Sequence, residues 1–338
     1  MPHTPKLRPA SSTLKRSLRR STAGGRAVIG ALVVCILGAS GCDRIRDTLR
    51  PPGGGGDPRW TGDSTLLASK PEILFRVRRL NGNERIVPIA TLGSHGFRPL
   101  YFSSRGWRAF DLEYLQKGSR LTTYRAGHAS GSAEMLRGMW EPPSAPLDTH
   151  STCGSVVPVA KAVMGNGVTL LTSGTRPPLK PVRALAASEL QAALGTVPTL
   201  IAPASGISGA RLLKFKREVY VVNSATSSSP TIVIVYNDPA LLADSVAPIA
   251  ERPRHLVVVL DRGVYGYRPT FTYASAGNRK SLPRYHFIDY LDVDDDGRAE
   301  LFFGMTDPRV PPLYTVVLRF ENEAWRELLR YDGNPCQS

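Results

Sequence analysis

Short apolar runs recur along the chain from about residue 60 onward. Each run is rich in β-branched and aromatic residues and is bounded by turn-forming residues, a pattern typical of β-strands. Residues 231–236, for example, read TIVIVY, in which every side chain is β-branched or aromatic. The pattern predicts strands over residues 73–78, 85–90, 214–222, 231–236, 255–260, 268–273, 284–289, 313–319 and 325–330.

Helical spacing is confined to two segments. Residues 188–191 read SELQ, a capping box, and the apolar residues that follow share one helical face. Gly195 then predicts the end of this helix. Residues 238–247 keep a similar spacing of apolar side chains and predict a second helix.

These patterns predict a mainly β fold of the α+β type, with antiparallel sheets and a few short helices. Near the carboxyl terminus we expect a strand-loop-strand and then a terminal hairpin, whose turn is residues 321–323. Residues 59–338 are expected to form a single globular domain. The only candidate boundary inside it is residues 138–182, where prolines and glycines are frequent and the strand pattern thins.

The formal net charge of +15 would by itself suggest a nucleic-acid partner. Its distribution argues otherwise, because residues 1–42 hold seven of the 43 basic residues and none of the 28 acidic ones. The rest of the chain therefore has 36 basic and 28 acidic residues, a net charge of +8. Much of the basicity belongs to the amino-terminal segment, and we expect no nucleic-acid partner.

The amino-terminal segment has the order of an export signal. A basic stretch rich in serine and threonine precedes the apolar residues 27–38, and small residues follow. The apolar stretch is too short for a comfortable membrane span, which disfavours the alternative of a transmembrane anchor. Residues 1–41 are therefore predicted to be a signal peptide.

The residues around the expected cleavage site carry a family resemblance. Ala39, Ser40, Gly41 and Cys42 resemble the lipobox of bacterial lipoproteins. The resemblance implies that Cys42 is lipidated and becomes the first residue of the mature chain, held at the membrane by its acyl chains. It also implies a place in the bacterial cell envelope, with the domain facing the periplasm or the exterior. Residues 42–58 include the run PPGGGGDP and are expected to be a flexible tether.

Cysteine usage agrees with export. Cys35 leaves with the signal peptide and Cys42 takes the lipid, so Cys153 and Cys336 remain. Two cysteines left over in an oxidising compartment most simply form a disulfide, which would hold the carboxyl terminus. The alternative is a pair of buried free thiols.

One segment, LDVDDDGRAEL at residues 291–301, concentrates carboxylates between apolar runs. Asp292, Asp294 and Asp296 alternate, glycine follows in the sixth position of the loop, and Glu300 stands in the ninth. Calcium takes oxygen ligands in this order, with the backbone carbonyl of the seventh residue, Arg298, as a further ligand. An EF-hand would also need a glutamate in the twelfth position and helical flanks, but Phe303 stands there and the flanks look like strands.

The same residues resemble the calcium loops of FG-GAP and VCBS-type repeats, which lie between two strands. The resemblance implies one structural calcium ion, bound by the side chains of Asp292, Asp294, Asp296 and Glu300 and by the carbonyl of Arg298. Crowded carboxylates raise one another's pKa unless a cation intervenes, which also favours a metal. The alternatives are a solvated acidic turn and a catalytic acid pair, for which five acids around one centre are poorly suited.

Common catalytic motifs are absent from the sequence. There is no Gly-x-Ser-x-Gly, His-Glu-x-x-His, P-loop or Cys-x-x-Cys. His150 and Cys153 lie close together, but a disulfide for Cys153 is the better interpretation, and His255 and His286 fall in predicted strands. No catalytic residue is predicted.

We therefore expect a membrane-anchored, non-enzymatic, calcium-stabilised module for binding or assembly in the cell envelope. Its partners are the membrane, through Cys42, and an envelope protein or polyanion. The alternative is an exported hydrolase whose active site the sequence does not disclose.

Overall fold

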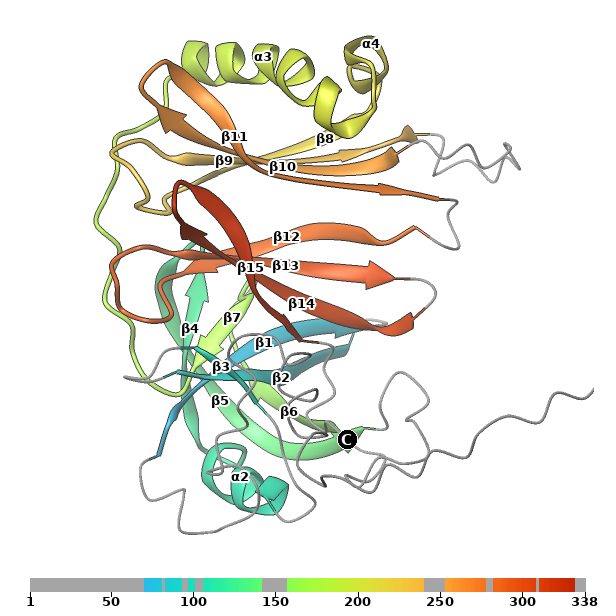
Figure 1. The fold of residues 1–338 in the computed structure, drawn as a ribbon. Coiled ribbons are helices and arrows are strands. Elements are labelled where there is room, and N and C mark those ends of the chain that lie inside the picture. The colour runs from blue at the N-terminus through green and yellow to red at the C-terminus, as the bar shows by residue number, and fades with distance from the viewer. Residues whose placement is uncertain are drawn as a thin grey trace, which may run out of the picture. The chain divides into compact units, whose positions relative to one another are not determined.

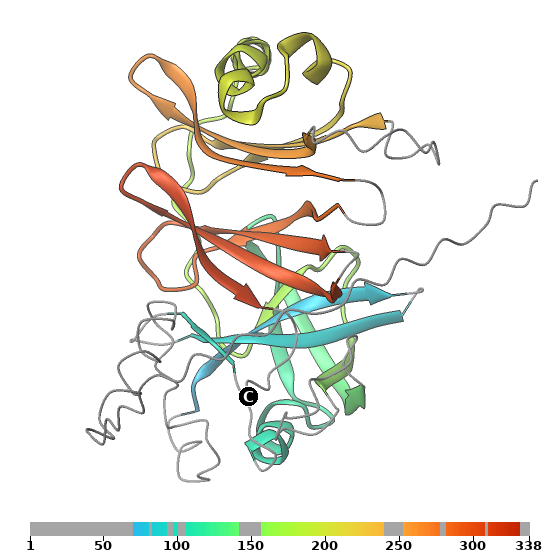
Figure 2. The same ribbon diagram turned by 45° about the vertical axis from the view of Figure 1, so that its right-hand side comes forward.

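The computed structural model describes residues 70–80, 83–92, 97–100, 106–141, 157–239, 253–277, 282–307 and 310–331 (Figures 1 and 2). All of them belong to one compact unit, Gly53–Ser338. Strands dominate this part of the chain, every strand pair in it is antiparallel, and its helices are few and short. The predicted fold class is confirmed. The predicted signal peptide, the tether, Cys42, Cys153 and Cys336 lie outside the described residues.

The first sheet closes into a barrel. Its strands are β1 (Glu72–Leu80), β2 (Asn83–Leu92), β3 (Arg98–Pro99), β4 (Arg120–Arg125), β5 (His128–Glu141), β6 (Val157–Val163) and β7 (Leu170–Thr172). They follow the order β1-β7-β4-β5-β6-β2-β3, and β1 also pairs with β2, which completes a ring of six strands. Helix α2 (Gly106–Tyr114) packs Phe110 and Tyr114 into the apolar interior. We call this part the barrel.

A second sheet is a simple meander near the carboxyl terminus. Its strands are β12 (Arg284–Leu291), β13 (Glu300–Asp307), β14 (Val310–Glu321) and β15 (Ala324–Tyr331), paired in chain order. The turn between β14 and β15 places Asn322 and Glu323 at positive φ, 50° and 62°, as a type I′ hairpin requires. The predicted terminal hairpin is confirmed.

This sheet, which we call the middle sheet, is covered on both faces. Along β13, Leu301 and Phe303 belong to an apolar cluster with strands β9 (Thr231–Asn237) and β10 (Pro253–Gly263), whereas Phe302 belongs to a cluster with residues of the barrel. Neighbouring side chains of a strand point to opposite faces. Two buried faces therefore explain why residues 301–303 are apolar without a break.

The third sheet carries the longest of the described helices on its outer face. It comprises β8 (Lys216–Val222), β9 (Thr231–Asn237), β10 (Pro253–Gly263) and β11 (Gly266–Ala276) in the order β11-β10-β9-β8. Helices α3 (Ala187–Ser205) and α4 (Gly209–Leu212) cover it (Figure 1). Residues of α3 such as Val197 and Ile201 pack against Ile232 and Val258. We call this the helix-covered sheet.

The predicted end of the first helix at Gly195 is wrong, because α3 continues to Ser205. Gly195 is exposed and has no neighbour that a side chain would meet, so it costs only about 1 kcal/mol of helix propensity. The apolar face resumes after it with the buried residues Val197 and Ile201, whose packing outweighs that cost. The second predicted helix, residues 238–247, lies almost wholly outside the described residues. None of the described helices has the length and apolar character that a membrane crossing needs.

Candidate metal centre

The acidic loop connects two neighbouring strands of the middle sheet. β12 ends at Leu291 and β13 begins at Glu300, and these two residues face each other across the antiparallel pair. The loop is therefore a strand-loop-strand and not the helix-loop-helix of an EF-hand. Gly297, its sixth residue, has a φ of +83°, which glycine adopts without steric cost. The sequence thus explains locally why the chain turns sharply here.

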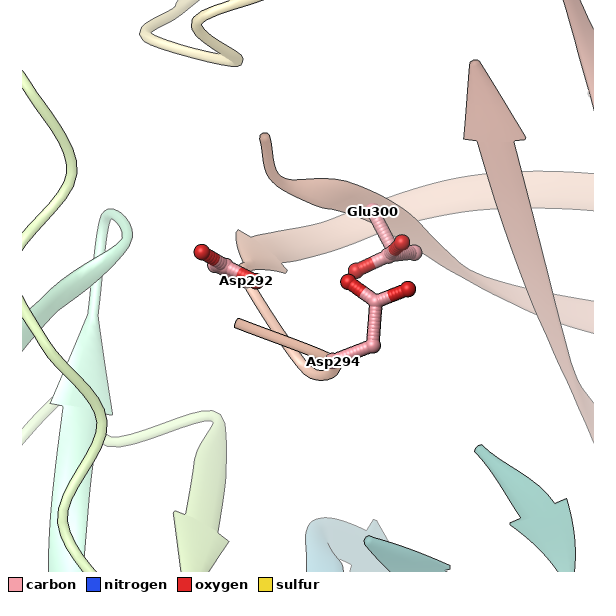
Figure 3. A group of neighbouring side chains, drawn as sticks. All are labelled: Asp292, Asp294 and Glu300. Carbon is pink, nitrogen blue, oxygen red and sulfur yellow. The ribbon is translucent and has the colours of Figure 1, made fainter. Parts of the chain in front are cut away.

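Three of the predicted ligands converge on one point. Asp292, Asp294 and Glu300 each offer a carboxylate oxygen, and these oxygens lie within 4.8 Å of one another. Figure 3 shows the carboxylates of Asp294 and Glu300 turned toward each other, with Asp292 beside them. Oxygens about 2.3–2.6 Å from a shared calcium ion would be separated by no more than roughly 5 Å, so the spacing suits this ion. We call these three residues the acidic triad.

Asp296, the fourth predicted carboxylate, is not part of the acidic triad. Asp296 is exposed, and its Oδ1 accepts a hydrogen bond of 2.7 Å from the backbone N–H of Arg298. This bond closes the turn at the tip of the loop. The structure thus brings together three of the four predicted carboxylates and leaves the fourth at the surface.

Two members of the acidic triad are deeply buried. Asp292 and Glu300 are each 2% exposed. Oδ2 of Asp292 accepts a hydrogen bond of 2.9 Å from the N–H of Gly297, but its buried Oδ1 has no hydrogen-bond partner among the described residues. A buried acceptor left without a partner is costly, and such an oxygen is often the ligand of a bound ion. The donor set, three carboxylates with one oxygen free, suits a hard cation.

Burial and mutual repulsion disfavour the charged forms of these carboxyls. Burial, together with the nearby charge of Asp294, raises the pKa of Glu300 to about 8, although the Val293 N–H and Arg319 oppose the shift. Burial also raises the pKa of Asp292, with smaller contributions from the charges of Asp296 and Asp294. A cation at this point would stabilise the ionised forms.

The chain itself supplies one cation, which the sequence did not suggest. Arg319 of β14 donates from Nη2 to Oδ2 of Asp294 at 2.5 Å and from Nε to Oε1 of Glu300 at 3.1 Å. It makes no ion pair with Asp292 among the contacts of the described residues. Arg319 therefore compensates two members of the acidic triad and leaves the third without a counter-charge.

A second arginine ties the loop to the barrel. Arg176, which follows β7, is 7% exposed and donates from Nη1 to Oδ2 of Asp295 at 2.7 Å. Its Nε and Nη2 bind the carboxylate of Glu72 on β1. The acidic loop is therefore held against the barrel by a buried guanidinium with two carboxylate partners.

The two described histidines that fall in predicted strands have different environments. His255 is fully buried; its Nε2 accepts from the N–H of Tyr285 at 2.9 Å, so the proton is on Nδ1, which lies 2.9 Å from Oδ1 of Asn237. It is a packed histidine with both nitrogens occupied. His286 is exposed on the other face of β12. His150 lies outside the described residues.

A cleft of about 870 Å³ lies away from the acidic triad, between α3, the β10–β11 hairpin and the β14–β15 hairpin. Its lining includes one buried carboxylate, Asp261. That carboxylate accepts hydrogen bonds from Trp325 and from three threonine hydroxyls, Thr226, Thr231 and Thr270. These contacts occupy both of its oxygens, and the lining residues include no histidine.

No family model, curated protein or solved structure matches the chain. The resemblances of residues 39–42 and 292–300 to known families therefore rest on those residues alone.

Proposed function

We propose that this chain is a lipid-anchored, non-enzymatic module for binding or assembly in the bacterial cell envelope, stabilised by one calcium ion. Two observations support the calcium ion: three carboxylates converge on one point, and one of the three residues, Asp292, has a buried oxygen with no hydrogen-bond partner among the described residues. The signal-like leader and the resemblance of residues 39–42 to a lipobox support the anchor.

The ion would stabilise the fold through the middle sheet. The acidic triad takes its ligands from both ends of the loop, so an ion there joins the end of β12 to the start of β13. An ion that binds only the folded chain adds stability with its concentration, about 2.7 kcal/mol at 100 times its Kd. Since the middle sheet packs against both other sheets, this stability extends to the whole domain.

The tip of the β10–β11 hairpin supports a role in binding. Tyr265 is fully exposed and Val264 is 92% exposed, and Leu200 of α3, 46% exposed, lines the same cleft. Large apolar side chains gathered at one surface favour protein–protein contact. A photo-crosslinking residue in place of Tyr265 is expected to capture a protein of the envelope in cells, whereas one in place of the exposed Leu112 of α2 is not. Equal crosslinking of envelope proteins at positions 265 and 112 would contradict a role of this hairpin in binding.

The calcium ion is tested by thermal unfolding. Calcium is expected to raise the Tm of the wild type, and Asp292→Asn and Asp294→Ala are each expected to abolish the rise. Glu321→Gln is the matched control, because Glu321 lies near Arg319 but outside the acidic triad. Magnesium, which demands a smaller octahedral site, should have a lesser effect. A wild-type Tm that does not respond to calcium would contradict the proposal.

The anchor is tested separately. Labelling of the protein with palmitate in cells is expected to be sensitive to globomycin and to be lost in Cys42→Ser. A wild-type protein that takes up no label would contradict the lipid anchor and leave the calcium ion untouched.

A further inference from the structure

The β10–β11 hairpin ends in two large side chains that project into solvent. Gly263 pairs with Gly266 across the hairpin, so the turn consists of Val264 and Tyr265 alone. Val264 is 92% exposed and Tyr265 is fully exposed. We call these two residues the hairpin tip. Removing their apolar surface from water is favourable, so the hairpin tip gains free energy when an apolar surface covers it.

Two ion pairs hold the hairpin tip in place. Arg262, just before the turn, forms an ion pair with Glu189 of α3. Arg268, just after it, binds through Nη2 to Oε2 of Glu323, in the β14–β15 turn, at 2.6 Å. A surface that is fixed before it meets a partner loses less conformational entropy on binding. The hairpin tip is therefore presented in a defined place beside the cleft that the same hairpin lines.

The cleft offers a partner few free polar groups. Apart from Tyr265 itself, every lining residue with a hydroxyl group donates that hydrogen within the chain: Thr196, Thr226, Ser227, Tyr267 and Thr270. The oxygens of Asp261 are occupied by some of these donors and by Trp325. A sugar or another polar ligand would be oriented by free donors and acceptors, which this lining mostly lacks. Methyl groups and rings remain, such as those of Leu200 and Phe320, and they suit an apolar occupant.

The charges around the cleft are balanced. Arg262 and Arg268 each have a glutamate partner, so the rim has little net charge. Residues 43–338 have a net charge of +8, so two copies of the chain repel each other in most orientations. At this rim a second copy meets equal numbers of both signs, and that repulsion is weakest. An anionic membrane would instead favour unpaired basic residues.

We infer that the occupant of the cleft is the hairpin tip of a second copy of this chain. Val264 and Tyr265 of each copy lie in the cleft of the other. The hairpin tip and the cleft belong to one surface patch, as a two-fold interface requires. The volume of about 870 Å³ falls within the roughly 300–1,000 Å³ that holds a drug-sized ligand, so two side chains have room. This inference rests on the binding role proposed for the hairpin and names its partner.

The mass of the full chain in detergent tests the second copy. Sedimentation equilibrium at matched detergent density is expected to show monomers and dimers in a concentration-dependent balance. Tyr265→Asp should weaken dimerisation about tenfold or more, because it places charges where two rings are buried. Thr196→Arg, on the exposed side of α3, should do the same by filling the cleft with a long charged side chain. Leu112→Asp, at an exposed leucine of α2, is the matched control and should dimerise as the wild type does.

A mixture of the two variants tests the exchange of hairpin tips. In a dimer of Tyr265→Asp with Thr196→Arg, one unaltered tip meets one unaltered cleft. Neither variant alone can form such a contact. The mixture is therefore expected to associate more tightly than either variant by itself. Association of the mixture that is no tighter would overturn the exchange.

A wild type that remains monomeric at every concentration would overturn the second copy. If a crosslinker at position 265 then captures a different envelope protein in cells, the proposed binding role survives without the dimer. Binding of the monomer to lipid vesicles that is lost in Tyr265→Asp would also overturn the second copy, and would assign the hairpin tip to the membrane. None of these outcomes bears on calcium or on the lipid at Cys42.

Discussion

The indole Nε1 of Trp325 donates a hydrogen bond of 2.7 Å to Oδ2 of Asp261. Trp325 is the second residue of β15 in the middle sheet and Asp261 lies on β10 of the helix-covered sheet, so the bond joins the two sheets. Asp261 is 4% exposed and is otherwise held by threonine hydroxyls at 2.5–3.0 Å. A buried carboxylate satisfied entirely by donors fixes how these sheets meet.

Replacing this carboxylate should destabilise the domain. Asp261→Asn puts an N–H₂ group among donors that need an acceptor, and each donor left unsatisfied costs about 1–3 kcal/mol. We expect a loss of at least about 2 kcal/mol in the free energy of unfolding, measured with urea. Glu323→Gln is the control, since Glu323 is an exposed carboxylate lining the same cleft, and it should change stability by less than about 0.5 kcal/mol.

Arg319 and a metal ion offer charge compensation to the same carboxylates. Without calcium, Arg319→Gln should lower the Tm, because Asp294 and Glu300 lose their counter-charge. With calcium, the rise in Tm should be larger in Arg319→Gln than in the wild type, because the ion then supplies the only positive charge. Arg330→Gln, which removes a surface pair with Glu327, is the control and should leave the calcium response unchanged. A smaller calcium response in Arg319→Gln would show that the arginine supports the ion.

Acid should destabilise the domain through His255. Burial, with the charges of Arg284 and His286, lowers its pKa to about 4 from the ordinary 6.5. The unfolded chain then binds the proton more readily, so the contribution of His255 is fully present above pH 6.5 and is lost as the pH falls toward 4. The total loss is on the order of 3 kcal/mol. Urea unfolding of the wild type at pH 7 and pH 4.5 measures it.

The matching variant for this titration is His255→Gln. Comparing it with the wild type at each pH cancels other groups, including Asp289 and Glu300, whose raised pKa values act in the opposite direction. We expect the stability difference between wild type and variant to shrink as the pH falls. A difference that is independent of pH would contradict this account of His255.

Alanine substitutions at two glycines distinguish the cost of a strained backbone conformation from the cost of a steric clash. Gly127, in the turn between β4 and β5, has a φ of +72°, and a Cβ there would lie 2.2 Å from the ring of the buried Tyr290. Gly118 has a φ of +88° but nothing within 4 Å of such an atom. Gly118→Ala should therefore cost about 1–2 kcal/mol from the left-handed conformation alone. Gly127→Ala should cost about 1–3 kcal/mol more, because the ring must move. Equal losses in urea unfolding would show that the contact between the barrel and the middle sheet is loose.

Sequence patterns predicted the secondary-structure elements that short segments of the chain determine by themselves. All nine predicted strands coincide with observed ones, and the strand-loop-strand at residues 284–307 follows from its acidic turn and apolar flanks. The barrel was hidden because strands such as β5, with the sequence HASGSAEMLRGMWE, are rich in small residues. Ala133 and Met135 fill the barrel interior there, and their neighbours are exposed. Closure of a ring of strands is a long-range property that no short window contains.

The candidate sites divide in the same way. Asp292, Asp294 and Glu300 were predicted because one loop holds all of them. Arg319 was not, because an arginine in a strand is expected at the surface as long as its partner is unknown. Arginines that bridge two sheets are hidden for the same reason: Arg76 of β1 donates a hydrogen bond to Thr315 of β14, 239 residues away in sequence. Such pairs depend on how the sheets pack against each other. The alternation of polar and apolar residues along a single strand does not predict that packing.

The position of the middle sheet in the chain has a consequence for biogenesis. β12–β15 are the last of the described strands to be synthesised, yet they cover apolar faces of both the barrel and the helix-covered sheet. Until residues 284–331 are synthesised, the barrel and the helix-covered sheet each expose an apolar face that favours aggregation. The chain therefore covers both apolar faces only after β12–β15 are made, and termination between β11 and β12 would leave a protein with two uncovered faces.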